Sequence, residues 1–68
     1  MKVDVKILSG GVKERTLEVH GDTTYEEMLL SLQINPELVI VFRKGDPVPL
    51  DERVTPDSVE ILRVVTGG

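Results

Sequence analysis

Two short segments near the start of the chain alternate between aliphatic and polar residues, and this alternation constrains the fold more than any other feature. From Lys2 to Leu8 the aliphatic positions recur with the period of a half-buried β-strand, at Val3, Val5 and Ile7. Residues 16–20 repeat the pattern with Leu17 and Val19. Residues 9–11, Ser-Gly-Gly, separate the two runs and provide a turn. The chain therefore begins with a β-hairpin that has one apolar face.

The next segment carries the signals of a helix start. Thr23 and Thr24 are both good N-caps, and each is followed three residues later by a glutamate, Glu26 or Glu27. Either pair can form a capping box, and the two carboxylates suit the positive end of the helix dipole.

A helical stripe follows, because apolar residues recur at i, i+3, i+4 and i+7: Tyr25, Met28, Leu29 and Leu32. Asn35-Pro36 is expected to end the helix, since the residue before a proline avoids the α region. The spacing predicts a helix of about two and a half turns that tertiary packing must stabilise.

The rest of the chain predicts strands and turns. Residues 38–42 form a continuous apolar run of strand length, and residues 43–46 form a turn. The prolines in residues 47–49 restrict that segment to a sheet edge or a loop. Residues 51–57 are expected to be irregular. Residues 59–65 form the last strand, with Val59 and Ile61 on one face.

This order of elements predicts an α+β fold in which a mixed sheet of four to five strands packs on one helix. A helix that returns the chain to the sheet needs a right-handed crossover, so the first and last strands can form a parallel central pair. That architecture is the β-grasp. We expect one β-grasp domain over residues 1–65 and a flexible C-terminal tail over residues 66–68.

Composition narrows the function classes. The 68 residues contain no cysteine and a single histidine, His20, so neither a disulfide nor a metal is expected to stabilise the fold. The net charge of −4 disfavours nucleic acid and favours a protein partner with a basic docking face. No stretch approaches the roughly 20 apolar residues of a membrane helix, and residues 1–4 do not resemble a signal peptide. We expect a cytoplasmic monomer with no catalytic residues, no metal and no bound cofactor.

Two segments resemble a known family. Residues 42–49, Phe-Arg-Lys-Gly-Asp-Pro-Val-Pro, and residues 59–68, which end in Val64-Val65-Thr66-Gly67-Gly68, are similar to the ubiquitin-like sulfur carriers. That family includes the sulfur carrier of thiamine biosynthesis, the small subunit of molybdopterin synthase, the ubiquitin-related modifier and the small archaeal modifier proteins. Gln33 departs from the pattern, because many relatives place a glycine after the helix.

The resemblance implies that the chain is the substrate of an enzyme and not an enzyme itself. A ubiquitin-activating-type enzyme would use ATP to adenylate the carboxylate of Gly68. A persulfide donor protein would then convert Gly68 to a thiocarboxylate, which a downstream acceptor enzyme uses in tRNA thiolation or cofactor biosynthesis. Alternatively, Gly68 is linked to target lysines as a protein modifier. A third possibility is a structural adaptor with an incidental tail.

Docking of such a partner requires an exposed surface beside Gly67 and Gly68. If Val59 and Ile61 face the helix, Leu62 and Val64 face outward, next to Thr66. The third strand adds either Ile40 with Phe42 or Val39 with Val41. We favour Ile40 and Phe42, so the predicted partner-binding surface comprises Ile40, Phe42, Leu62, Val64 and Thr66.

Overall fold

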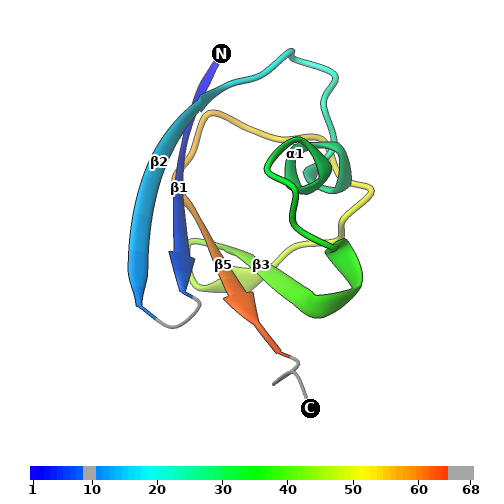
Figure 1. Ribbon diagram of the computed structural model, residues 1–68. Coiled ribbons are helices and arrows are strands. Elements are labelled where there is room, and N and C mark those ends of the chain that lie inside the picture. Colours follow the sequence, from blue (N-terminus) through cyan, green and yellow to red (C-terminus); the bar gives the residue numbers. More distant parts are fainter. Residues whose placement is uncertain (9–10, 65–68) are drawn as a thin grey trace.

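The computed structural model describes residues 1–8 and 11–64 (Figure 1). Its elements in chain order are β1 (Lys2–Leu8), β2 (Val12–Glu18), α1 (Tyr25–Ser31), the 3₁₀ helix η1 (Pro36–Leu38), β3 (Val39–Arg43), β4 (Asp46–Pro47) and β5 (Val59–Arg63).

The strands form one mixed sheet in the order β2-β1-β5-β3-β4. The two central strands, β1 and β5, are parallel, and the other neighbouring pairs are antiparallel. In Figure 1 the sheet curves around α1, which covers its concave face. This arrangement confirms the predicted α+β, β-grasp fold with a parallel central pair.

The core lies between α1 and the concave face of the sheet. The apolar positions of the alternating strands and the helical stripe meet there, and nine side chains are buried: Val3, Val5, Tyr25, Met28, Leu29, Val41, Val54, Val59 and Ile61. Because these residues exclude water on one face only, the polar positions of the same strands remain on the other face.

Thr24, and not Thr23, caps the helix. Its hydroxyl oxygen accepts a hydrogen bond from the backbone N–H of Glu27 at 3.2 Å, and the Glu27 carboxylate accepts from the backbone N–H of Thr24 at 3.0 Å. This reciprocal pair is the capping box. Thr23 instead uses its backbone carbonyl to accept from Val54 at 2.7 Å. Thr24 therefore caps the helix through its side chain, whereas Thr23 joins the helix start to Val54 through its backbone carbonyl.

The predicted end of the helix was wrong by about one turn. The helix has seven residues and ends at Ser31, before Asn35-Pro36. Gln33 adopts a φ of 61°, and the N–H groups of Gln33 and Ile34 bond to the carbonyls of Leu30 and Leu29. These are the two bonds of a Schellman motif, which ends a helix without a proline. Asn35 then caps η1, where its side chain accepts from the N–H of Glu37 at 3.0 Å.

Several strand boundaries also differ from the prediction. The strand β2 starts at Val12, four residues before the alternation, and ends at Glu18. It is an exposed edge strand, so residues 12–15 need not alternate in hydrophobicity. The strand β3 starts at Val39 because residues 36–38 form η1. The strand β5 ends at Arg63, and the N–H of Val64 bonds to the carbonyl of Leu38 at 3.0 Å.

The hairpin between β3 and β4 turns at Lys44 and Gly45, as predicted. Both residues have positive φ, 54° and 83°. Such a turn matches the twist of the flanking strands, and glycine suits its second position. Within the described ranges no helix is both long and apolar enough to cross a membrane.

Candidate docking surface

The convex face of the sheet is not covered by α1 and carries the exposed aliphatic side chains of β3 and β5. Ile40 is 38% exposed, Leu62 is 39% exposed and Val64 is 48% exposed, whereas Val41 and Ile61 are buried on the opposite face. The alternation of each strand explains this division, because consecutive side chains point to opposite faces. These exposures decide between the two alternatives for β3, because they place Ile40, and not Val41, on the convex face.

The register of the sheet aligns four aliphatic residues across four strands. Val12 is opposite Leu8, Leu8 is opposite Leu62, and Leu62 is opposite Ile40. We call Val12, Leu8, Leu62 and Ile40 the apolar row. Val12 is 63% exposed and Leu8 is half-buried. Side chains at directly opposed positions lie within contact distance, so the row is continuous.

Sequence reasoning missed Leu8 and Val12. The signal for Leu8 was present in the sequence. Val3, Val5 and Ile7 face the helix, so the alternation of β1 places Leu8 on the opposite face. Val12 had no comparable signal, because its segment does not alternate. Its place in the row follows from the hairpin register alone.

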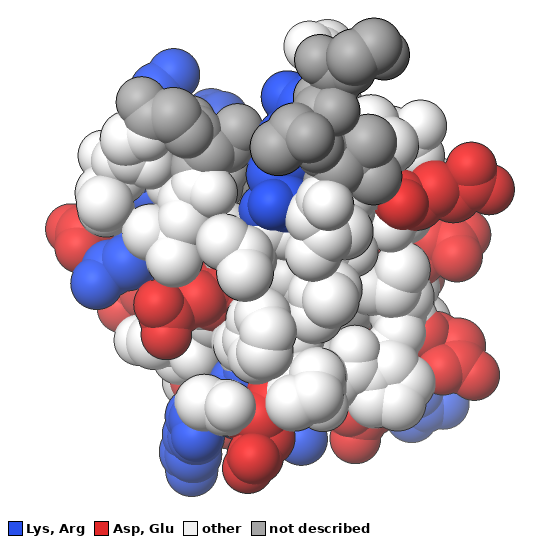
Figure 2. Space-filling model, turned by 90° about the horizontal axis from the view of Figure 1, so that it is seen from below, with Lys and Arg blue, Asp and Glu red and all other residues white. Residues whose placement is uncertain are grey.

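Phe42 and Val64 extend the apolar row. Phe42 is half-buried and lies two residues beyond Ile40 on β3, opposite Glu60. Val64 follows β5 directly. Figure 2 shows the same surface as a broad uncharged area with both acidic and basic side chains on its border. Exposed apolar areas of this kind on a small domain mark interaction surfaces.

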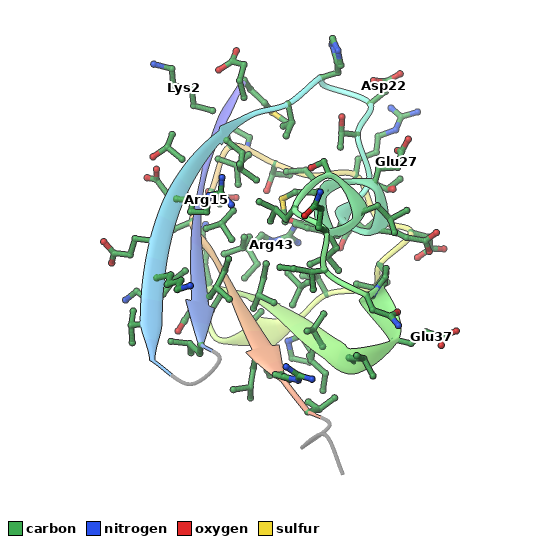
Figure 3. All side chains as sticks on the ribbon, viewed as in Figure 1. Lys2, Arg15, Asp22, Glu27, Glu37 and Arg43 are labelled. Atoms are coloured by element: carbon green, nitrogen blue, oxygen red, sulfur yellow. The ribbon has the colours of Figure 1, made fainter. Side chains whose placement is uncertain are left out.

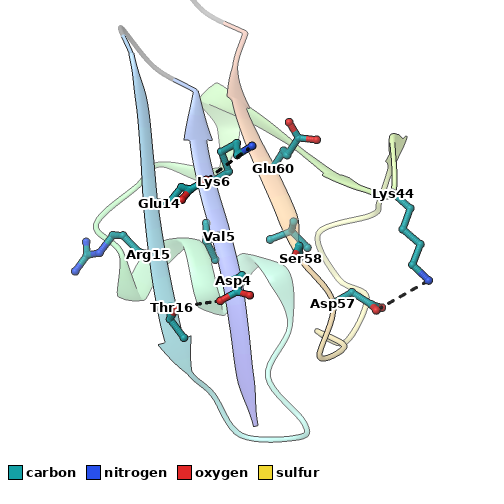
Figure 4. A pocket seen from close by; sticks show the side chains of 11 residues that line it. Asp4, Val5, Lys6, Glu14, Arg15, Thr16, Lys44, Asp57, Ser58 and Glu60 are labelled. Atoms are coloured by element: carbon teal, nitrogen blue, oxygen red, sulfur yellow. Dashed lines mark hydrogen bonds and ion pairs between the residues drawn. The ribbon is translucent and has the colours of Figure 1, made fainter.

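A shallow hollow of about 850 Å³ adjoins the apolar row (Figure 4). Charged side chains of β1, β2, β5 and two loops line the hollow on this face: Asp4, Lys6, Glu14, Lys44, Asp57 and Glu60. The Nζ atom of Lys6 lies 3.9 Å from Oε1 of Glu14, and the Nζ atom of Lys44 lies 4.0 Å from Oδ1 of Asp57. The carboxylates therefore outnumber the ammonium groups on this part of the face.

The predicted reactive residues Gly67 and Gly68, and Thr66 of the predicted surface, lie outside the described residues, as does Val65. The last described residue, Val64, is nevertheless informative. Since β1 and β5 are parallel, their carboxyl ends lie at the same edge of the sheet. The apolar row at Leu8 and Leu62 therefore lies at the edge from which the chain continues toward Gly68.

The helix side of the sheet has one notable polar contact. Arg43 donates a hydrogen bond to the phenolic oxygen of the buried Tyr25 at 3.1 Å and lies 3.7 Å from Glu52. Figure 3 shows Arg43 between the sheet and α1. The hydrogen bond to Tyr25 raises the pKa of Arg43, and the negative charges of Glu52 and Asp57 raise it further. This contact is structural, since it lies on the face opposite the apolar row.

Among residues 1–8 and 11–64, no three histidine, aspartate or glutamate side chains are grouped so that they could hold a metal ion. The charged groups of the hollow carry no arrangement of nucleophile and base.

Comparisons with known proteins match most or all of the chain. The family model of small archaeal modifier protein 2 matches residues 1–65. An uncharacterized protein of Archaeoglobus fulgidus is 41% identical over 68 residues, and the small archaeal modifier protein 2 of Haloferax volcanii is 34% identical over 68 residues, each covering 100% of both chains. The sulfur carrier protein TtuB of Thermus thermophilus is 32% identical over 82% of this chain and 88% of its own.

Solved structures have the same fold. SAMP1 from Haloferax volcanii superposes with a TM-score of 0.74 at 20% identity and covers 100% of both chains. The ubiquitin of Caldiarchaeum subterraneum also gives a TM-score of 0.74 at 20% identity, over 100% of this chain and 98% of its own. These two similarities establish a ubiquitin-like fold.

Proposed function

The chain belongs to the small archaeal modifier protein 2 family of ubiquitin-like carriers and modifiers, and from this we propose that the carboxyl group of Gly68 is its reactive group. The observation that carries the proposal is the position of Gly67-Gly68 in the sequence, which begins four residues after the end of β5, the strand that carries Leu62 of the apolar row. The described residues offer a surface for recognition, so the chemistry is assigned to the main-chain carboxylate.

The proposed reaction begins with adenylation. An activating enzyme binds the domain and ATP, and a Gly68 carboxylate oxygen attacks the α-phosphorus of ATP, which releases pyrophosphate. The product is an acyl adenylate with AMP as a good leaving group. Activation is needed because a free carboxylate is a poor electrophile.

Sulfur then replaces the AMP group. The terminal sulfur of a persulfide donor attacks the Gly68 carbonyl, a C–S bond forms, and AMP leaves with the carboxylate oxygen. A thiol of the donor cleaves the resulting acyl disulfide, which leaves a thiocarboxylate on Gly68 and a disulfide on the donor. The 32% identity to the sulfur carrier TtuB supports this branch. The thiocarboxylate would supply sulfur to a downstream acceptor in tRNA thiolation or cofactor biosynthesis.

The two glycines suit this reaction for a steric reason. An extended terminus without Cβ atoms fits a narrow active site, and glycine adopts backbone conformations that other residues avoid. Ordering two glycines costs conformational entropy. Docking of the folded domain through the apolar row offsets that cost.

Intact-mass spectrometry tests the proposal. The purified protein is incubated with the adenylating enzyme of its own organism, ATP and sulfide. We expect a gain of about 16 Da, because one sulfur replaces one oxygen by acyl substitution. The variant that lacks Gly67 and Gly68 is the control and should gain nothing. An unchanged mass of the full chain under conditions in which ATP is turned over would contradict the sulfur-carrier proposal.

Protein modification is the second candidate function, and the 34% identity to a small archaeal modifier protein favours it. Here the amino group of a target lysine attacks the activated Gly68 carbonyl and forms an isopeptide bond. High-mass conjugates in cell lysate that disappear on deletion of Gly68 would support this function. If deletion of both glycines changes neither conjugates nor cellular phenotype, the chain is a structural adaptor and both candidates are wrong.

A further inference from the structure

We infer that the convex face of the sheet docks a protein surface that presents apolar side chains to the apolar row and an arginine or lysine side chain to Glu60. This inference rests on the proposed function, since the partner is the adenylating enzyme, and it adds the chemistry by which that partner is recognised.

The first step is the position of Glu60. It lies on the central strand β5, opposite Phe42 on one side and Lys6 on the other, two residues before Leu62 of the apolar row. Glu60 is exposed, and its carboxylate makes no hydrogen bond and no ion pair with the described residues. A carboxylate without a partner therefore occupies the middle of the uncovered face.

The second step is the charge of the hollow around Glu60. Of its carboxylates, Glu14 and Asp57 are each paired with a lysine, and Asp4 accepts a hydrogen bond only from the neutral hydroxyl of Thr16, at 2.9 Å. Neither Asp4 nor Glu60 forms an ion pair, and the one ammonium group opposite Glu60, that of Lys6, is paired with Glu14. Arg15 also lines the hollow, but it is opposite Val5 in the register, and in Figure 4 its side chain extends away from Asp4 and Glu60.

The third step is the relative position of Asp4 and Glu60. Lys6 is the register partner of Glu60, so Asp4 and Glu60 occupy diagonal positions on neighbouring strands and on the same face. A guanidinium group is planar and donates up to five hydrogen bonds in a fixed fork, so an arginine that reaches into the hollow can bind the Glu60 carboxylate through two of them, with the negative charge of Asp4 nearby.

The fourth step excludes a second copy of this chain as the partner. Two copies that met through this face in a symmetric dimer would place the same excess of carboxylates against itself. Like charges brought together in a partly desolvated interface cost several kcal/mol. A partner of opposite charge satisfies both the apolar row and Glu60, which fits the overall net charge of −4.

The test is a kinetic titration of the adenylating enzyme of the same organism with this protein, measured by ATP–pyrophosphate exchange. The variants are Glu60→Gln and Glu60→Lys, and the matched control is Glu37→Gln. Glu37 is exposed on η1 and lies well away from the hollow (Figure 3). Circular dichroism confirms that each variant is folded, which is expected because Glu60 and Glu37 are both exposed.

We expect Glu60→Lys to raise the KM for this protein by about tenfold or more and to leave kcat unchanged, because the lost contact acts in docking and not in chemistry. Glu60→Gln should raise the KM less, and Glu37→Gln should leave it at the wild-type value. The KM of the wild-type protein should rise with salt more steeply than that of Glu60→Gln.

Three outcomes would overturn the inference. Equal KM values for the wild type and Glu60→Lys would show that no cation faces Glu60, while exchange by the wild type would leave the proposed function intact. A wild-type dimer in sedimentation equilibrium that Glu60→Lys alters would assign the face to a second copy. No exchange with the wild-type protein would remove the proposed function and the inference together.

Discussion

Arg43 and Tyr25 join the third strand to the start of the helix: a guanidinium nitrogen of Arg43 lies 3.1 Å from the phenolic oxygen of Tyr25. Tyr25 is fully buried, and its hydroxyl is the polar end of the helical stripe. Because the ring packs in the core while the oxygen receives a charged donor, one residue supplies both packing and a charge-assisted hydrogen bond.

Removal of that oxygen should weaken the fold without opening a cavity of any size. We expect Tyr25→Phe to lower the free energy of unfolding by about 1–3 kcal/mol, the range for hydrogen bonds to charged groups. Urea denaturation followed by circular dichroism measures the change. Retention of Glu52 beside Arg43 should keep the loss toward the lower end of that range.

The same contact predicts no pH dependence near neutrality. The pKa of Arg43 is raised in the folded protein, so its stabilisation is complete below the unfolded pKa and is lost only as the pH rises through the folded pKa, which is strongly alkaline. The difference in unfolding free energy between wild type and Tyr25→Phe should therefore be the same at about pH 5 and about pH 8. A difference that changes by more than about 0.5 kcal/mol in this window would argue against the ion-assisted bond.

The capping box gives a second stability prediction. Thr24→Ala removes the acceptor for the N–H of Glu27 and should lower the free energy of unfolding by about 1 kcal/mol. Thr23→Ala is the matched control, because Thr23 contacts Val54 through its backbone carbonyl, which alanine retains. Equal losses in the two variants, measured by urea denaturation, would show that Thr24 does not act as the cap.

Gln33 offers a stabilising substitution. Its φ of 61° is unfavourable for a residue with a Cβ atom by roughly 1–2 kcal/mol, and glycine removes that cost. Glycine also increases the entropy of the unfolded chain, so we expect Gln33→Gly to raise the free energy of unfolding by a net amount of about 0.5–1 kcal/mol. Gln33→Ala retains the Cβ atom and should give no gain. Thermal unfolding of the two variants side by side decides the point.

Local periodicity predicted the central part of the fold from sequence. The alternation of Val3, Val5 and Ile7, the helical stripe from Tyr25 to Leu32, and the alternation around Ile61 all reflect burial against one shared core. Each of these segments has one buried and one exposed face, so its pattern carries the information. The order of such segments was enough to predict the parallel central pair.

The features that sequence reasoning missed depend on tertiary context or on backbone geometry. Residues 12–15 lie on an exposed edge, where burial imposes no pattern. The helix ends at Ser31, and Gln33, two residues later, adopts the positive φ of the helix-ending motif, a conformation that its side chain does not favour, so no composition signal marks the boundary. Gln33 was noted only as a departure from the pattern of the resembled family, and its φ of 61° is a conformation that glycine adopts more readily than glutamine.

The candidate site was predictable in part for the same reason. The alternation along β5 predicted that Leu62 and Val64 lie on the uncovered face. The apolar row, in contrast, is recognised only from the register between four strands. Register is set by the hairpin and by the crossover, and a single sequence does not show it. The role of Ile40, Phe42, Leu62 and Val64 in partner binding remains a prediction, as does the reactivity of Gly67 and Gly68.

The mass of the C-terminal tryptic peptide tests the central claim most directly. Cleavage after Arg63 releases residues 64–68, Val-Val-Thr-Gly-Gly, which contain no methionine. This matters because oxidation of Met1 or Met28 also adds about 16 Da. After reaction with the adenylating enzyme, ATP and sulfide, we predict that the gain of about 16 Da is found on this peptide and depends on ATP. An unmodified peptide from protein whose intact mass has risen would place the change elsewhere and contradict activation at Gly68.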